Sequence, residues 1–227
     1  MIKTGVICST HTEWATRASV LSLKRHNPEW DIEIHADEDY VWLADLPAKV
    51  VVTGKISHPA KLERFLLASQ SDFVAFVDSD VTFHEPILDE MVSMISGDII
   101  GVGLNCPADV KQQLGIFDHL SGHPWHKQGF ILSPRPTPWL LAFKACKPVI
   151  DACKKVGFHQ ALIDSAGAHG LAFDVLGLWA FVLEAAGYRF DYIASNDRAF
   201  HWQSVSWLGG RYRDCLPYFM EIAKECQ

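Results

Sequence analysis

Two aspartates separated by a single residue, Asp78 and Asp80, are the side chains of this sequence best suited to chemistry. They follow an apolar run at residues 73–77, of the kind that forms a strand buried on both faces of a parallel sheet. Carboxylates this close repel each other, and a divalent cation relieves the repulsion. Ligands of open α/β sheets bind at the carboxyl edge. The pattern therefore predicts a metal site there, although acidic strand ends can also only cap a turn.

The segments before the aspartates alternate between strands and helices. We expect strands over 2–8, 32–36 and 50–52, and helices over 13–26 and 59–68. This βαβ alternation is typical of a nucleotide-binding half-fold.

The segments after the aspartates continue the mixed pattern. We expect a helix over 87–96, strands over 99–104 and 128–133, helices over 139–147, 149–156 and 173–186, a strand over 188–194 and a last helix from Leu216. The irregular stretch at 105–127 is long enough to suggest a functional loop. The expected fold is a mixed α/β domain over 1–227, with a mostly parallel sheet flanked by helices.

The composition excludes several classes of function. The chain has 227 residues, a formal charge of −7 and no run of Lys or Arg, so a nucleic acid is not an expected partner. No apolar stretch is long enough to span a bilayer, and the first residues lack the pattern of a signal peptide. Six cysteines without C-x-x-C spacing favour reduced thiols, and with them a cytoplasmic location.

Short motifs in a fixed order extend the argument beyond the aspartates. They are Thr10 after the first strand, Lys61-x-x-Arg64, Asp78-x-Asp80, Gln128-Gly129-Phe130, Asp174 at a helix start, and His201-Trp202. This order resembles glycosyltransferases of the GT-A fold, which take a sugar from a nucleotide-sugar donor, and is most similar to the group of glycogenin and bacterial galactosyltransferases. That group has Asn-Ala-Gly where this chain has Lys127-Gln128-Gly129, which bears on the donor sugar and the stereochemistry.

The resemblance implies a metal site made of Asp78, Asp80 and His201. A cation bound there would neutralise the charge that develops on a departing nucleoside diphosphate. An imidazole among oxygen ligands favours Mn²⁺ over Mg²⁺. For His201, flanked by aromatic residues, the competing interpretation is a histidine packed in the core.

The resemblance also implies a donor site. Lys61 and Arg64 would face the phosphates or ribose, with Arg64 pointing inward, unless both belong to a solvated helix face. Thr10 and Asp37, at the first two strand ends, would hold the base, although capping and turn roles are equally open for both. Ser79, between the two aspartates, belongs to the same donor site.

The candidate catalytic residues come from the second half of the chain. Gln128 and Gly129 would lie beside the donor sugar, although Gly129 can also mark a bulge. Asp174 would contact the acceptor hydroxyl, as general base in an inverting enzyme, and Asp164 is a second candidate for that role. A carboxylate at a helix start is also stabilised by the helix dipole in any protein.

The expected function is therefore a metal-dependent glycosyltransferase with Mn²⁺ or Mg²⁺. It would move a sugar from a UDP-sugar to a hydroxyl acceptor such as a glycan, with residues 1–104 as the nucleotide-binding half and 105–227 as the acceptor-binding half. One alternative is a phosphatase of the haloacid dehalogenase type, with Asp78 as nucleophile and Asp80 as acid/base. Another is a nucleotide-sugar-binding module without turnover.

Overall fold

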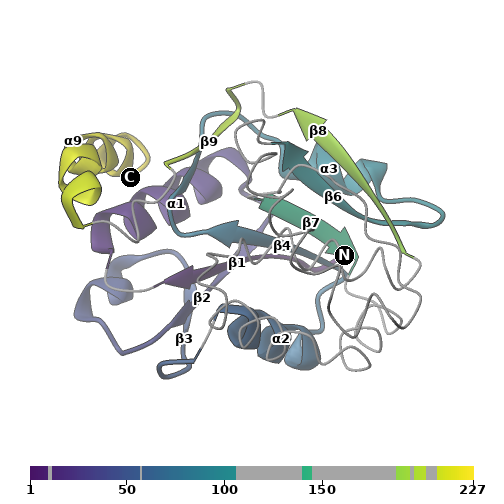
Figure 1. Ribbon diagram of the computed structural model, residues 1–227, viewed down its shortest axis with the longest axis horizontal. Helices are drawn as coiled ribbons and strands as arrows, with labels where there is room; N and C mark the ends of the chain where they lie inside the picture. The colour runs from purple at the N-terminus through teal and green to yellow at the C-terminus, as the bar shows by residue number, and fades with distance from the viewer. Residues whose placement is uncertain (10–11, 57, 106–139, 145–187, 195–196, 203–208) are drawn as a thin grey trace, which may run out of the picture.

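A computed structural model describes residues 1–9, 12–56, 58–105, 140–144, 188–194, 197–202 and 209–227. Its centre is a seven-stranded sheet with the strand order β3-β2-β1-β4-β7-β6-β8 (Figure 1). The strands are β1 (Lys3–Ser9), β2 (Asp31–Ala36), β3 (Lys49–Val52), β4 (Phe73–Asp78), β6 (Ile99–Asn105), β7 (Leu140–Lys144) and β8 (Arg189–Ala194).

The sheet is mixed and mainly parallel, as expected from the sequence. Strands β3, β2, β1 and β4 pair in parallel, β6 pairs in parallel with β8, and only β7 runs antiparallel to its neighbours β4 and β6. The register places Cys8 opposite Asp78 and Ser9 opposite Ala36. The carboxyl ends of β2, β1 and β4 therefore lie side by side at one edge of the sheet.

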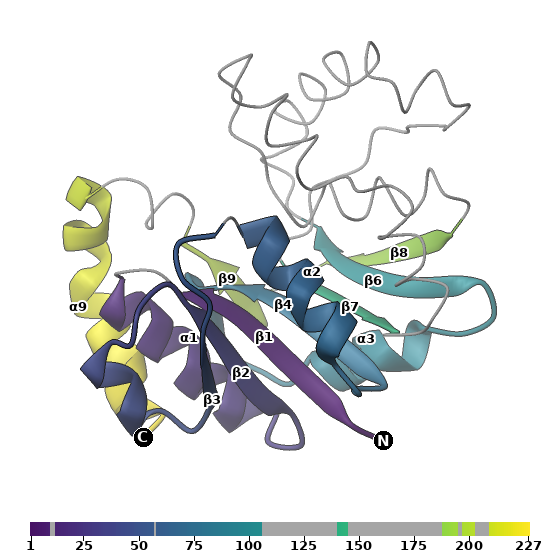
Figure 2. The same cartoon turned by 90° about the horizontal axis from the view of Figure 1, so that it is seen from below.

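Helices cover both faces of this sheet. Helix α2 (His58–Ala68) lies on one face, and α1 (Glu13–His26) and α3 (Leu88–Met94) lie on the other (Figures 1 and 2). The C-terminal helix α9 (Gly209–Glu225) packs beside α1. The bounds of α1 match the prediction, and α2 buries Leu62, Phe65 and Leu66 against the sheet as its spacing predicts.

The core is formed mainly by the strands and by the inner faces of the helices. Ile7, Ile34 and Phe76, from β1, β2 and β4, are fully buried. Gly5 allows α1 to approach β1 closely, because a Cβ atom there would lie 2.9 Å from a methyl carbon of Leu23. Helix α1 therefore packs directly against β1.

A second, two-stranded sheet was not predicted. It joins β5 (Val81–Phe83), which begins directly after Asp80, to β9 (Ala199–His201) in antiparallel pairing, with Val81 opposite His201. Each strand is too short to give a periodic signal in the sequence. The pairing brings two segments together that lie far apart along the chain.

Two predicted elements are wrong. Residues 140–144 form strand β7 where a helix over 139–147 was expected, because a short apolar run fits either structure and β4 and β6 supply hydrogen-bond partners on both sides. Helix α9 begins at Gly209, where a start at Leu216 was expected, and includes Pro217 in its interior. Packing of the fully buried Phe219 offsets the unfavourable effect of an interior proline.

The predicted strand over 128–133, the predicted helices over 149–156 and 173–186, and residues 106–127 of the irregular stretch lie outside the described residues. Asn105, the first residue of that stretch, is the last residue of β6. Within the described ranges, no helix combines the length and the apolar character needed to cross a bilayer.

Candidate active site

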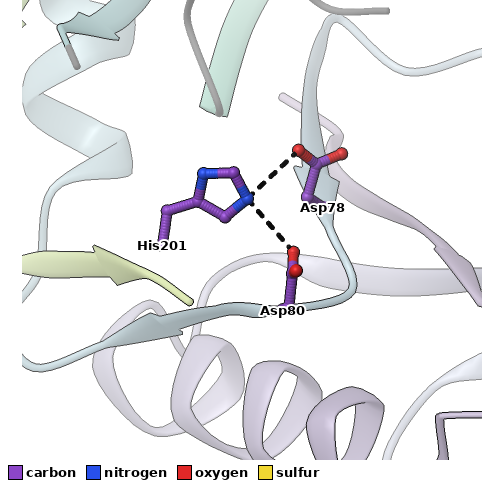
Figure 3. A group of neighbouring side chains, drawn as sticks. All are labelled: Asp78, Asp80 and His201. Atoms are coloured by element: carbon purple, nitrogen blue, oxygen red, sulfur yellow. Dashed lines mark ion pairs between the residues drawn. The ribbon is translucent and has the colours of Figure 1, made fainter. Parts of the chain in front are cut away.

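Asp78, Asp80 and His201 converge at the carboxyl edge of β4. Asp78 is the last residue of that strand, Asp80 follows in a tight turn, and His201 is the last residue of β9 (Figure 3). The Nε2 atom of His201 lies 3.3 Å from Oδ1 of Asp80 and 3.8 Å from Oδ2 of Asp78. The structure thus brings together the three residues that the sequence analysis named as metal ligands.

The geometry of this group fits a divalent cation. One ligand atom from each residue can be chosen so that all three lie within 4.8 Å of one another, and no other group in the described part of the chain meets this condition. Cations of this class bind ligands at about 2.0–2.6 Å, so ligands of one ion lie roughly 3–5 Å apart. The Asp80 side chain is 5% exposed and that of Asp78 is 35% exposed, so one side of the group faces the protein and another is open to a ligand.

The two-stranded sheet holds His201 in this position. Besides the pairing of Val81 with His201, the backbone N–H of Trp202 donates to the carbonyl oxygen of Asp80 at 3.0 Å. On the other side of β5, the N–H of Phe83 donates to the hydroxyl of Ser22 in α1 at 3.0 Å. Ser79, in the turn between the aspartates, is buried. The metal group therefore depends on backbone contacts that the sequence motifs did not reveal.

Asp37 and Lys61 form a second charged pair at the same edge. Asp37 follows β2, and its Oδ1 accepts a hydrogen bond from the ammonium group of Lys61, which is fully buried. A lysine is seldom buried unless it is paired, so this contact explains the position of Lys61. Because β2 and β4 are two strands apart, Asp37 and Asp78 are separated by roughly 10 Å across the sheet.

The expectation that Arg64 points inward is wrong. Arg64 is exposed, whereas Lys61 points toward the sheet with Leu62 and Phe65. Residues three apart on a helix are rotated by about 60° from each other, which is enough to place one in the core and the other at its solvent-facing rim. The assignment of Arg64 to donor phosphates remains a prediction.

Tyr40 is a neighbour of Asp37 that the sequence analysis did not single out. Its ring stacks on Trp42 with centroids 5.6 Å apart. Burial raises the pKa of Tyr40, and the carboxylates of Glu38 and Asp37 raise this pKa further. The sequence signal that could have identified Tyr40 is its position directly after the acidic residues 37–39 at the end of β2.

Arg17 continues this aromatic group toward α1. Its guanidinium carbon lies 5.6 Å from the ring centroid of Trp14 and 5.9 Å from that of Trp42. Arg17 also pairs with Glu13 at 2.9 Å. The group ties the start of α1 to the segment that follows β2.

Five further candidate residues lie outside the described residues: Thr10, Gln128, Gly129, Asp164 and Asp174. Thr10 comes directly after β1, the strand between Asp37 and Asp78 in the sheet. The roles expected for these five residues remain predictions.

Comparison with known proteins relates this architecture to a fold. No protein-family model matches the sequence, and no curated protein is found to be similar to it. Solved structures do match. The galactosyltransferase LgtC, in complex with donor and acceptor sugar analogues, is 11% identical over 98% of this chain and 95% of its own, with a TM-score of 0.60.

Two further matches have similar scores. The mannosyltransferase PcManGT from Pyrobaculum calidifontis, in complex with GDP-Man and Mn²⁺, is 13% identical over 85% of this chain, with a TM-score of 0.52. TarS from S. aureus, residues 1–349, is 12% identical over 98% of this chain, also with a TM-score of 0.52. This chain spans 54% of the PcManGT chain and 65% of residues 1–349 of TarS.

At these identities the likeness concerns the fold. The mainly parallel sheet and the helices on both of its faces agree with the fold of these glycosyltransferase structures. The haloacid dehalogenase alternative required a different architecture, in which the acidic motif follows the opening strand, whereas Asp78 here ends the fourth. The chain therefore has the GT-A fold of nucleotide-sugar glycosyltransferases.

Proposed function

We propose that this protein is a metal-dependent glycosyltransferase that moves a sugar from a nucleotide-sugar donor to a hydroxyl acceptor. The observation that carries the proposal is the group of Asp78, Asp80 and His201 at the carboxyl edge of a GT-A fold. Structural neighbours support it: PcManGT forms a complex with GDP-Man and Mn²⁺, and LgtC with donor and acceptor sugar analogues.

The three residues have distinct tasks in this proposal. A bound cation would act as a Lewis acid and screen the negative charge on the leaving nucleoside diphosphate. Asp80, which is buried, would hold the cation from the protein side, and Asp78, which is more exposed, would face the donor. The imidazole of His201 favours Mn²⁺ over Mg²⁺.

The nucleoside would lie along the carboxyl edge, from the metal group toward Asp37. A separation of roughly 10 Å between the ends of β4 and β2 suits a nucleotide whose diphosphate is near Asp78 and whose base is near Asp37. Because Lys61 engages one oxygen of Asp37, the other oxygen is the better placed to accept a hydrogen bond from a base. Uracil presents one N–H on its pairing edge, which matches the one available oxygen of Asp37, whereas guanine presents two. We therefore propose a UDP-sugar donor.

The acceptor and the reacting sugar would be handled by residues that the family resemblance assigns. Asp174, with Asp164 as the second candidate, would orient or deprotonate the acceptor hydroxyl, and Gln128 and Gly129 would lie beside the donor sugar. A glycan is the acceptor class that this resemblance favours.

The test is release of free nucleotide from a panel of UDP- and GDP-sugars with Mn²⁺, followed by product analysis. We expect turnover that chelation abolishes and that falls roughly 100- to 1000-fold in Asp78→Ala and Asp80→Ala, because one such electrostatic group is typically worth about 3–4 kcal/mol of barrier. Asp98→Ala is the matched control, since Asp98 pairs with Arg189 on the surface.

Two outcomes would contradict the proposal in different ways. Wild-type rates in both Asp78→Ala and Asp80→Ala would remove the metal group from the chemistry. Binding of a nucleotide sugar without release from any donor would indicate the alternative, a binding module that kept the fold without turnover.

A further inference from the structure

Trp202 links the candidate metal group to the C-terminal helix. Its backbone N–H donates to the carbonyl oxygen of Asp80, and its indole Nε1 donates to Oγ1 of Thr82, each at 3.0 Å. Thr82 is fully buried in β5. Trp202 is thus bonded to the residues on both sides of Val81, which pairs with His201.

The indole ring packs against helix α9. Its centroid lies 5.0 Å from that of Phe219 in an edge-to-face arrangement and 5.7 Å from that of Tyr218. Phe219 is fully buried, whereas Tyr218 is exposed. The inner face of α9 therefore supports the segment that presents His201.

Helix α9 is in turn fastened to α1. The hydroxyl oxygen of Tyr212 accepts a hydrogen bond from the backbone N–H of Trp14, in the first turn of α1, at 3.0 Å. Farther along α1, the hydroxyl of Ser22 accepts a hydrogen bond from Phe83 of β5. The contacts form a closed ring from α1 through β5, Trp202 and α9 back to α1.

This ring supplies stability that the small sheet lacks. A two-stranded sheet is marginally stable by itself, and β5 and β9 have three residues each. The position of His201 relative to Asp80 therefore depends on Trp202 and α9. If the contacts between Trp202 and α9 raise the metal affinity of the site, metal binding must stabilise those contacts by the same free energy. This follows because coupling between two sites is reciprocal.

We propose that Trp202 is a positioning residue through which α9 sets the metal affinity of the site, and that metal binding in return stabilises the docking of α9. The proposal rests on metal binding by Asp78, Asp80 and His201. It adds that a helix outside the metal group controls its occupancy.

The experiment measures Mn²⁺ affinity by titration calorimetry and amide hydrogen exchange in residues 209–225 with and without Mn²⁺. Trp202→Phe keeps an aromatic ring against Phe219 but removes the indole donor, and Thr82→Val removes the acceptor of the same bond from the other side. Met220→Ala is the matched control, because Met220 is an exposed residue of the same helix. Circular dichroism verifies that each variant is folded.

We expect Trp202→Phe and Thr82→Val each to weaken Mn²⁺ binding by about 3- to 10-fold, the equivalent of one net hydrogen bond. Met220→Ala should bind Mn²⁺ as the wild type does, and Mn²⁺ should slow exchange in α9 of the wild type and less so in Trp202→Phe. Unchanged Mn²⁺ affinity in folded Trp202→Phe and Thr82→Val would overturn this inference alone. Absence of Mn²⁺ binding in the wild type would overturn the proposed metal site and this inference together.

Discussion

At the scale of single residues, the ion pair of Lys61 and Asp37 is the feature that most changes the account of the donor site. The family resemblance implies that Lys61 faces the donor phosphates or ribose, but its ammonium group is fully buried and bonded to Asp37. The contact occupies one of the two carboxylate oxygens of Asp37, directly after β2. We therefore propose that Lys61 sets which oxygen of Asp37 is available to a base.

This gives a prediction on base selectivity. Lys61→Met would free Oδ1 of Asp37, so a base with two N–H donors gains an acceptor. We expect the preference for a UDP-sugar over the matching GDP-sugar to fall by about 3- to 10-fold in kcat/KM, the value of one hydrogen bond. The measurement is the ratio of kcat/KM for the two donors.

The control for this prediction is Lys55→Met. Lys55 is exposed and pairs with Glu38 at 3.2 Å, so its loss removes a positive charge nearby without touching Asp37 directly. Equal selectivity in Lys61→Met and Lys55→Met would show that Lys61 does not influence base recognition. A thermal melt of both variants separates selectivity from loss of folded protein.

At the scale of elements, the first turn of α1 shows how α9 is attached to the rest of the fold. The first turn of α1 has backbone N–H groups that no helical carbonyl can satisfy. Thr12, at the N-cap, makes no side-chain capping bond, and Tyr212 of α9 accepts from Trp14 in its place. Tyr212, in the last helix of the chain, thus performs the task of an N-cap side chain.

The corresponding prediction concerns stability. Tyr212→Phe should lower the free energy of unfolding by about 1 kcal/mol, the usual value of a lost helix cap, because the N–H of Trp14 loses its partner in a partly buried place. Urea unfolding followed by circular dichroism measures the change. Tyr218→Phe removes the same hydroxyl from an exposed position of α9 and should be close to neutral. A comparable loss in both variants would argue against the capping role.

At the scale of the whole molecule, the sequence predicted the parallel half of the sheet better than the rest. The strands at β1, β2, β3 and β4 and the helices between them follow from apolar runs and their periodicity, and α1 was predicted to the residue. Strand β7 was taken for a helix because its identity as a strand comes from its neighbours in space, β4 and β6. No local pattern contains that information.

In the candidate site, too, the features that depend on local sequence were predicted and those that depend on long-range contacts were not. Asp78 and Asp80 were recognisable because they follow a buried strand, and His201 was recognisable only from the order of motifs. What brings His201 to the aspartates is the pairing of β5 with β9 and the bond from Trp202 to Asp80, which are long-range contacts. The ion pair of Lys61 with Asp37 was missed for the same reason, since helix periodicity places Lys61 and Arg64 close together but does not say which is buried.

The proposed activity requires one cation that is held by Asp78, Asp80 and His201 and shared with a nucleotide. Calorimetric titration of Mn²⁺ into the protein, without and with UDP, tests this most directly. We predict one Mn²⁺ site whose affinity rises in the presence of UDP and which Asp80→Ala removes. Mn²⁺ binding that is indifferent to UDP, or that persists unchanged in Asp80→Ala, would contradict the account.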